Sequence, residues 1–520
     1  MFRNYDVQLT GRLLTVTLFT ILSIAGIAFS IYLFLISRTL YMYALSSAFT
    51  ALSLFAGFFN IYASIWYYRS YLYDKYLKGI NAWLKPLSRF PTIAVAIPVY
   101  NEEPEMVERN LKSLMKLNYP KAKLHFYMLD DSTDTTIAGS LSAVAKKFKI
   151  AYIHRNDRKG YKAGALNNLM KVCKEEYLAI FDSDEYLTNR NFLIDTLPYF
   201  QNAKISYIQT EKRYARGTFF SDAVDIFDAF FFKFIQPARA LNNTAVFAGS
   251  CGVIRTSALE KIGGFPEYVI EDTFFSFESD MHGFESLYVP KVYALGRPIM
   301  TFTELVKQQW RYNYGDTQFI RYFLSRPGPK KPRDPFGNID YWTHGLGLNY
   351  ISIVLIIFTL ISIGMVFSSI PFEHLNVLNP FAQTSNLNLS LEFLGFFAFL
   401  LSLLTPVILT KIYFKSLTKG LMVFLLNYAL AFVRTKAAIA TFVSSKNPGI
   451  HWNRLKIQQQ SGSRNIVSSI LNTKAEILFS MSMFGLAIFA LSESNLAGGF
   501  WLAWYGILYM SATAFLLKYG

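Results

Sequence analysis

Two clusters of acidic residues each follow a short apolar stretch of the chain. Asp130 and Asp131 come directly after Leu124 to Leu129, and Asp182-Ser183-Asp184 comes directly after Tyr177 to Phe181. Carboxylates this close together need a counter-ion, and Mg²⁺ or Mn²⁺ on a phosphate-bearing ligand would supply it. The alternative is ordinary turn and helix-capping chemistry, which a single Asp-x-Asp alone would favour. The second cluster is therefore a candidate metal site.

Alternating strand and helix patterns surround these clusters. Thr92 to Val99 is a nearly continuous apolar run, which fits a strand buried on both faces of a parallel sheet. Further strands are predicted at 124–129, 150–153 and 177–181, and helices after Pro104 and at 136–148 and 163–173. The result is a doubly wound α/β pattern, in which ligands bind beyond the carboxyl ends of the strands. Both acidic clusters are therefore expected in one crevice.

Long apolar segments flank this region on both sides. Hydrophobic residues make up 52% of the 520 positions, more than is usual for a soluble domain. Six runs without Asp, Glu, Lys or Arg approach or exceed the roughly 20 residues that a spanning helix needs. They are Leu13 to Ser37, Leu40 to Tyr68, Tyr341 to Ile370, Phe393 to Thr410, Ile477 to Ser492 and Ser494 to Leu517. Leu417 to Phe442 contains Lys419, Arg434 and Lys436, which predicts an amphipathic helix in the membrane interface instead.

The distribution of Lys and Arg predicts the orientation of these spans. Ser368 to Leu389 and Glu493 to Gly498 contain neither residue and are expected outside, because short basic loops are retained in the cytoplasm. Residues 69–340, 411–474 and both termini then lie in the cytoplasm of a multi-pass cell membrane protein. The net charge of +16 fits anionic lipid and a phosphate-bearing substrate. Nucleic-acid binding is disfavoured, because no basic stripe carries interleaved stacking aromatics.

These patterns divide the chain into four parts. We expect two transmembrane helices and a linker at 1–90, and a cytosolic α/β domain at 91–300. Interfacial helices at 301–340 lead to four C-terminal transmembrane helices at 341–520, with an interfacial helix and a polar loop near 417–470. Cys173 and Cys251 both lie on the cytosolic side, where reduced thiols are the default.

Seven short motifs follow one another along the chain. They are Ile97-Pro98-Val99-Tyr100-Asn101-Glu102, Asp130-Asp131, Lys162-Ala163-Gly164-Ala165-Leu166-Asn167, Asp182-Ser183-Asp184, Phe247-Ala248-Gly249-Ser250-Cys251, Glu271-Asp272 and Gln308-Gln309-Trp310-Arg311-Tyr312. The residue types, order and spacing of these motifs resemble those of glycosyltransferase family 2. Within that family, the set resembles the membrane-integrated polysaccharide synthases such as cellulose and hyaluronan synthases. The resemblance is close over about 92–320 and loose over the C-terminal helices. It implies a GT-A-like nucleotide-sugar domain and inverting hexosyl transfer that depends on Mg²⁺ or Mn²⁺.

The resemblance also implies a role for each motif. Asp272 is the expected catalytic base, and Asp182 and Asp184 are the expected metal ligands. The expected donor-binding residues are Tyr100, Glu102, Asp130, Asp131, Lys162, Asp182, Gln308, Arg311 and Lys446. The expected acceptor-binding residues are Cys251, Glu271 and Tyr312. The chemistry is consistent, since inversion needs a carboxylate to deprotonate the acceptor hydroxyl and a metal to stabilise the departing diphosphate.

Simpler roles compete with two of these assignments. Asp272 could cap a helix around 273–281, which is compatible with acting as a base. Arg311 could contact lipid headgroups from an interfacial helix, although its guanidinium also suits phosphate oxygens.

The sequence departs from the family pattern at several positions. Ile270 replaces the usual Thr before Glu271-Asp272, and Tyr312 replaces a Trp whose ring forms a stacking platform for the acceptor sugar. Val443 to Lys446 resembles part of a nucleotide-covering loop of cellulose synthases, but Thr441 stands where that motif has Phe. A snorkelling segment at the membrane edge explains this stretch nearly as well.

Two acceptors therefore stay open: a growing glycan, or a membrane lipid that receives a single sugar, as in glycolipid synthases of the ceramide or polyprenyl-phosphate type. By analogy the donor is a UDP-sugar. A transporter is disfavoured because no repeated or charge-bearing spans are evident. A catalytically dead nucleotide sensor is disfavoured because every required carboxylate is present.

Overall fold

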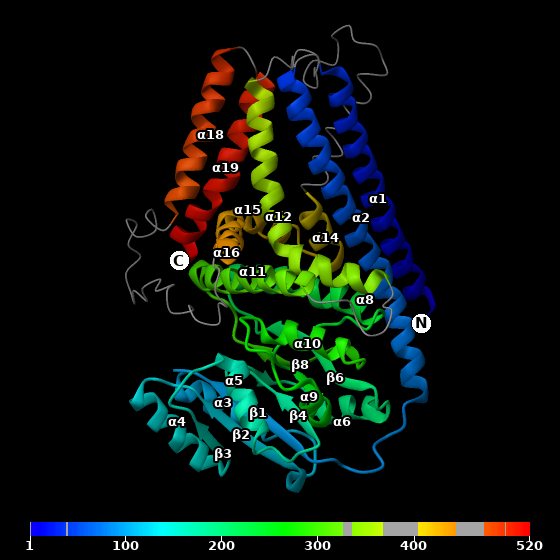
Figure 1. The fold of residues 1–520 in the computed structure, drawn as a ribbon, viewed down its shortest axis with the longest axis vertical. Helices are drawn as coiled ribbons and strands as arrows, with labels where there is room; N and C mark the ends of the chain where they lie inside the picture. Colours follow the sequence, from blue (N-terminus) through cyan, green and yellow to red (C-terminus); the bar gives the residue numbers. More distant parts are fainter. Residues whose placement is uncertain (1, 38–39, 326–334, 368–403, 444–472, 494–495) are drawn as a thin grey trace.

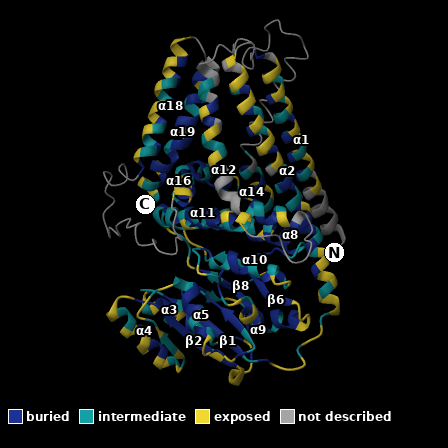
Figure 2. Ribbon diagram, in the orientation of Figure 1, coloured by how far each residue is buried: buried dark blue, intermediate teal, exposed yellow. Residues whose placement is uncertain are grey.

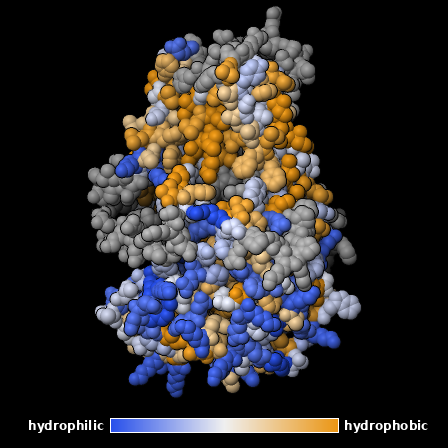
Figure 3. Space-filling view, viewed as in Figure 1, coloured by the Kyte–Doolittle hydropathy of each residue, from blue (hydrophilic) through white to orange (hydrophobic). Residues whose placement is uncertain are grey.

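The computed structural model describes residues 2–37, 40–325, 335–367, 404–443, 473–493 and 496–520. An α/β domain lies below a bundle of long helices, and a layer of helices that includes α11 (Phe302–Ser325) separates the two (Figure 1). Hydrophilic residues dominate the visible surface of the lower part and hydrophobic residues that of the upper part (Figure 3). The division into a polar domain and an apolar bundle agrees with the sequence prediction.

The α/β domain is built on one mixed sheet of eight strands. Their order is β3-β2-β1-β4-β7-β6-β8-β5. The strands are β1 (Ile93–Val99), β2 (Leu124–Asp130), β3 (Ala151–His154), β4 (Tyr177–Ile180), β5 (Tyr186–Leu187), β6 (Ile205–Tyr214), β7 (Gly252–Arg255) and β8 (Glu285–Gly296). Strands β1 to β4 are parallel, which confirms the predicted pattern for the first half of the domain. Strand β7 runs antiparallel to both β4 and β6, so the doubly wound pattern does not extend to the second half.

Helices cover both faces of the parallel half. Val95 and Ile97 of β1 point to the core formed with α3 (Pro104–Leu114) and α4 (Thr135–Phe148). Ala94 and Ala96 point to the opposite core, formed with α5 (Tyr161–Met170) and α10 (Glu271–Met281). A strand buried on both faces needs apolar residues at every position, which is why β1 reads as an unbroken apolar run. Most strand residues are accordingly buried (Figure 2).

Shorter helices join the second half of the sheet. They are α6 (Phe192–Thr196), α7 (Phe219–Phe230), α8 (Gln236–Ala240) and α9 (Thr256–Ile262). The upper layers contain α1 (Phe2–Ile36), α2 (Leu40–Trp83), α12 (Pro335–Phe367), α14 (Thr405–Phe414), α15 (Leu417–Ala429), α16 (Ala431–Val443), α18 (Lys474–Ser492) and α19 (Leu496–Tyr519).

Five helical stretches in the described part of the chain are long and apolar enough to cross a membrane. They are Thr15–Leu35, Tyr43–Trp83, Leu417–Val443, Lys474–Ser492 and Gly498–Tyr519. Four of them coincide with predicted spans. The predicted span 341–370 falls largely within α12, whose described residues include the shorter apolar stretch Ser352–Ile361, and most of the predicted span 393–410 lies outside the described residues. Outward apolar side chains such as Leu35 (71% exposed) and Leu478 (64% exposed) suit contact with lipid.

The stretch Leu417–Val443 differs from the other candidates. It consists of two helices, α15 and α16, that meet at Leu430, and both lie just above α11, beside the lower ends of the upright helices α18 and α19 (Figure 1). Its charges pair with three different elements: Lys419 Nζ lies 2.8 Å from Asp222 of α7, Arg434 donates to Gln309 of α11, and Lys436 Nζ lies 3.9 Å from Glu476 of α18. This arrangement fits the predicted interfacial position better than a spanning one.

A buried carboxylate, Asp340, joins the helix bundle to the α/β domain. It accepts hydrogen bonds from Tyr62 (2.5 Å) and Arg69 (3.4 Å) of α2, and from Thr244 (2.9 Å) and Asn242 (3.0 Å) of the α/β domain. The carboxylate is fully buried, so its charge depends on these donors for stabilisation.

We expect Asp340→Ala to destabilise the protein by about 3 kcal/mol, because removing one partner of a buried ion pair leaves the other charge uncompensated. The measurement is the midpoint of thermal unfolding of the purified protein in detergent. Lys204→Ala is the matched control, since Lys204 is exposed and its ion pair with Glu285 is long at 3.8 Å. Equal midpoints for the two variants would show that the Asp340 network contributes no more than a surface pair.

Candidate active site

The two acidic clusters lie at the same edge of the sheet and are linked through the start of α5. Asp130 pairs with Val99 in the β1–β2 register, and the parallel strand β4 runs into Asp182. Arg155 binds Asp131 through Nε (2.7 Å) and Nη2 (2.5 Å) and donates to the carbonyl of Tyr161, the first residue of α5. The next residue, Lys162, contacts Asp182. A chain of polar contacts therefore connects the two clusters.

Both members of the first cluster already have protein partners. Asp130 is fully buried and accepts from the amide of Ser132 (2.8 Å) and the hydroxyl of Tyr152 (2.5 Å). Asp131 is held by Arg155. Contact of either carboxylate with the nucleobase of the donor therefore stays a prediction.

Two arginines near the first acidic cluster were not predicted from the sequence as site residues. Besides Arg155, the Arg158 guanidinium stacks on the Tyr100 ring, 3.2 Å from its centroid. Both arginines come from the loop between β3 and α5. The sequence signal that was overlooked is the basic run from Arg155 to Lys159, directly before the Lys162 motif.

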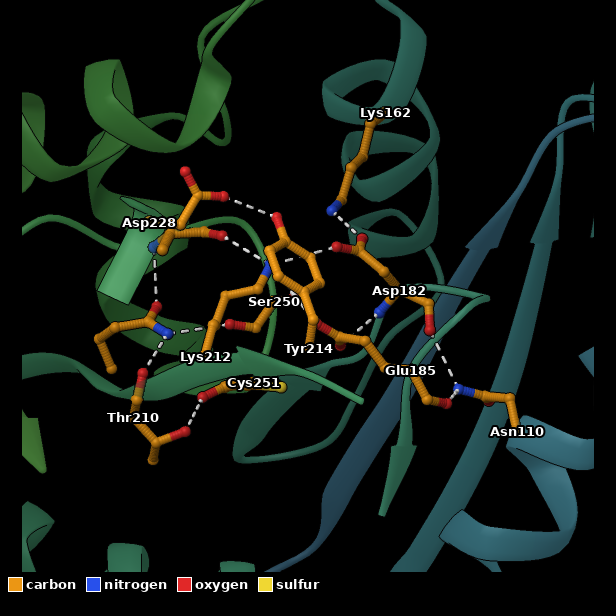
Figure 4. Close-up of polar contacts among 12 residues, drawn as sticks. Asn110, Lys162, Asp182, Glu185, Thr210, Lys212, Tyr214, Asp228, Ser250 and Cys251 are labelled. Atoms are coloured by element: carbon orange, nitrogen blue, oxygen red, sulfur yellow. Dashed lines mark hydrogen bonds and ion pairs between the residues drawn. The ribbon is translucent and has the colours of Figure 1, made fainter. Parts of the chain in front are cut away.

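Asp182 lies between two lysines. Lys162 contacts Oδ1, and Nζ of Lys212 lies 3.4 Å from Oδ2 (Figure 4). Burial acts to raise the pKa of Asp182, but the charges of Lys162 and Lys212 outweigh it and hold this pKa well below its usual range. Asp182 is therefore ionised at neutral pH.

Asp184 has the opposite environment. Burial and the charges of Asp182 and Glu185 raise the pKa of its carboxyl to about 7. Burial also raises the pKa of Glu102. This part of the site is thus rich in carboxylates, and the charge of Lys212 does not offset their effect on Asp184.

These residues fit a divalent metal that arrives with a diphosphate. In the described ranges, no three His, Cys, Asp or Glu side chains are grouped so that they could hold an ion by themselves. Mg²⁺ commonly takes only one or two carboxylates and completes its shell with phosphate oxygens and water. Asp182 and Asp184 would hold it here, and its charge would relieve the repulsion that raises the Asp184 pKa.

The predicted base, Asp272, lies in the first turn of α10. Its Oδ1 accepts a hydrogen bond from the backbone N–H of Thr273 (2.8 Å), so a helix-start role coexists with a catalytic one. Burial raises the pKa of Asp272, and burial together with the Asp272 charge raises the pKa of the adjacent Glu271 to about 7. A raised pKa makes a carboxylate a better proton acceptor at neutral pH.

Gly249 brings the segment 247–251 close to Asp272, the predicted base. It has φ +79°, and a Cβ atom at this position would lie 3.1 Å from Asp272 Oδ2 and 3.5 Å from Lys162 Nζ. Only glycine combines this backbone conformation with so close an approach. Asp272, Lys162 on Asp182 and the loop 247–251 therefore meet at one point.

The remaining predicted site residues have the following surroundings. The Cys251 side chain is 1% exposed and packs in the core, while its carbonyl accepts from Thr210 (2.6 Å). Gln308 donates to the Tyr214 hydroxyl (3.0 Å), which donates to Asp228 (2.9 Å). Arg311 lies over the Tyr312 ring, 5.3 Å from its centroid. Lys446 falls outside the described residues.

Known proteins share part of this chain. Residues 94–263 match the family model for Glycosyl transferase family 2. Over 254 residues the chain is 30% identical to a cellulose synthase catalytic subunit (UDP-forming) of Pseudomonas fluorescens (strain SBW25), covering 47% of this chain and 34% of that protein. Over 257 residues it is 31% identical to probable glucomannan 4-beta-mannosyltransferase 7 of Oryza sativa subsp. japonica, covering 46% and 42%. The chain thus spans less than half the length of these relatives.

One solved structure is similar over most of its length. A mannosyltransferase from Pyrobaculum calidifontis, in complex with GDP-Man and Mn²⁺, has a TM-score of 0.46 and 16% identity to this chain. The similarity covers 74% of this chain and 99% of that one.

Proposed function

We propose, from the premise that this chain carries a glycosyl transferase family 2 domain at residues 94–263, that it transfers a hexose with inversion from a nucleotide-sugar to an acceptor at the cytosolic membrane face. In this proposal residues 91–300 form the catalytic domain and 301–340 its interfacial helices. The long apolar helices at 1–90 and 341–520 anchor the domain, with both termini in the cytoplasm.

The observation that carries the proposal is the meeting of Asp272, Lys162 and Gly249 beside Asp182. A carboxylate with a raised pKa there can take the proton of an acceptor hydroxyl, whose oxygen then attacks the anomeric carbon of the donor. The bond from that carbon to the nucleoside diphosphate breaks from the opposite side, which inverts the configuration. Lys162 lies where it can balance the charge of the leaving diphosphate.

A bound metal, the two carboxylates that would hold it, and Arg311 would support this arrangement. A divalent metal, when bound, would supply further positive charge for the departing phosphates. Asp182 and Asp184 are the carboxylates that would hold it. Burial acts to lower the pKa of Arg311, but Tyr312, Glu271 and Asp272 outweigh it and raise this pKa, so the guanidinium stays charged and can orient the phosphates with its planar fork.

We favour a polysaccharide-synthase-like reaction with a UDP-hexose donor and a growing glycan as acceptor. The similarity to a cellulose synthase catalytic subunit and to a probable glucomannan mannosyltransferase supports this preference. Transfer of one sugar to a membrane lipid remains the second candidate, because Tyr312 offers a smaller stacking face than the Trp of the family pattern.

The two candidates differ in their products. We expect the purified protein, given a panel of UDP- and GDP-sugars, to make an oligosaccharide of several sugars, detected by mass spectrometry. Tyr312→Ala should shorten this product because it removes the ring on which the acceptor sugar stacks. Tyr186→Ala, a change of a partly exposed Tyr on β5, is the control and should leave product length unchanged. A product that always extracts as a lipid carrying one sugar would favour the second candidate.

A further inference from the structure

Lys212 of β6 occupies a central position that no motif of the sequence predicted. Its ammonium lies 3.4 Å from Asp182 Oδ2, 3.4 Å from Glu185 Oε1, 3.3 Å from the Ala248 carbonyl and 2.5 Å from the Ser250 hydroxyl (Figure 4). An ammonium group has three hydrogens and no acceptor, so all these contacts are donations. Ser250 in turn donates to Glu185 (2.7 Å). Lys212 thus joins the Asp-x-Asp turn to the segment 247–251.

The contact with Asp182 competes with metal binding. Lys162 contacts one oxygen of this carboxylate and Lys212 the other, so a metal must displace at least one ammonium group. Lys212 can leave at low cost. Its distance to Asp182 is long, and it keeps Glu185, Ala248 and Ser250 as acceptors when Asp182 turns away.

We propose that Lys212 is a built-in counter-ion of Asp182 that gives way to the divalent metal, an inference that rests on the proposed function. Without nucleotide, Lys212 and Lys162 neutralise Asp182 and repel a dication. A nucleoside diphosphate adds negative charge and oxygen ligands, so the metal loads together with the nucleotide. Lys212 then remains on Ser250 and Ala248 of the segment 247–251.

The proposal predicts the direction in which metal affinity changes. Removing a single positive charge from a position about 4 to 6 Å from a dication strengthens dication binding by roughly tenfold, even when water screens the site well. Lys212→Gln should therefore bind Mn²⁺ alone about tenfold more tightly than the native chain. Lys212→Arg, which keeps the charge, should bind Mn²⁺ like the native chain. General damage to the site would weaken binding instead.

The experiment is a titration of free Mn²⁺ by electron paramagnetic resonance on the full-length purified protein, with and without UDP. Lys204→Gln is the matched control, because Lys204 directly precedes β6 but is exposed and pairs only loosely with Glu285. Thermal unfolding and UDP binding establish that each variant is folded. The native chain should bind Mn²⁺ at least about tenfold more tightly with UDP than without it.

Unchanged or weaker Mn²⁺ binding by a folded Lys212→Gln protein overturns the inference while leaving metal-dependent transfer intact. If that variant does not fold, equal Mn²⁺ affinity of the native chain with and without UDP overturns the inference in the same way. A native chain that transfers sugar yet binds no Mn²⁺ even with UDP overturns both this inference and the metal dependence of the proposed function.

Discussion

Replacing Asp272 by Asn should reduce sugar transfer by at least about a hundredfold while donor binding stays normal. The variant retains the size of the side chain and an oxygen that can still accept the hydrogen bond from Thr273 N–H, so α10 should begin as before. What it loses is a carboxylate that can take the proton of the acceptor hydroxyl. The measurement is kcat at saturating donor, together with the Kd for UDP.

Asp134→Asn is the control for this change. Asp134 starts α4 by accepting from the amides of Thr136 and Ile137, and Asn caps a helix about as well as Asp does. Asp134→Asn also replaces a carboxylate by an amide, but at a helix start outside the site, so transfer should remain normal. Near-normal kcat in the Asp272→Asn protein would falsify the assignment of Asp272 as the base.

The parallel half of the fold could be predicted because the apolar pattern that specifies each strand lies within a few consecutive residues. Strands β1 and β4 are short apolar runs that are almost entirely buried, and β2 is mostly buried although its His125 is exposed. The position of the acidic clusters followed from that alone, because carboxyl ends of parallel strands share one edge. The antiparallel strand β7 was not predictable in this way. Its partners β4 and β6 lie far from it in sequence, and four residues carry little periodicity.

The residues of the site that were missed depend on contacts between distant elements. Lys212 is a single Lys in a strand, and nothing in its neighbourhood indicates that its ammonium reaches the turn after β4. Likewise, the burial of Cys251 follows from the left-handed backbone at Gly249 and Cys251, which turns the thiol inward. A motif predicts which residues gather at a site but not which atoms they present. The carbonyl of Cys251, rather than its thiol, makes the hydrogen bond to Thr210.

For the segment 417–443, composition and three-dimensional arrangement lead to different predictions. By length and hydropathy alone, 417–443 qualifies as a span. Its charges favour an interfacial position, because Lys419 and Arg434 have partners in the α/β domain and in α11. Buried charges at membrane depth require such partners, so their pairing is the more informative feature.

The second large effect is expected at Asp184. We predict that chelation of divalent metal abolishes transfer and that Asp184→Asn lowers it by at least about a hundredfold, since the metal stabilises the charge of the leaving diphosphate. Asp195→Asn, an Asp that pairs with Lys291 at the surface, is the control and should keep full activity. Full activity of the Asp184→Asn protein in excess chelator would show that the metal assignment is wrong.

The pH dependence of Mn²⁺ binding provides a further test, because a purely structural role of Asp184 would not produce it. Burial and the charges of Asp182 and Glu185 raise the pKa of Asp184 to about 7, so without metal this carboxyl is largely protonated below pH 7 and ionised above it. A proton and a metal compete for the same oxygens. The affinity for Mn²⁺ in the presence of UDP should therefore fall as the pH drops through about 7, and it should level off above that value. In Asp184→Asn there is no proton to displace at this position, so the remaining weak affinity should lose that dependence. A native chain whose Mn²⁺ affinity is constant between pH 6 and pH 8 would contradict direct binding through Asp184, even if chelation stopped the reaction.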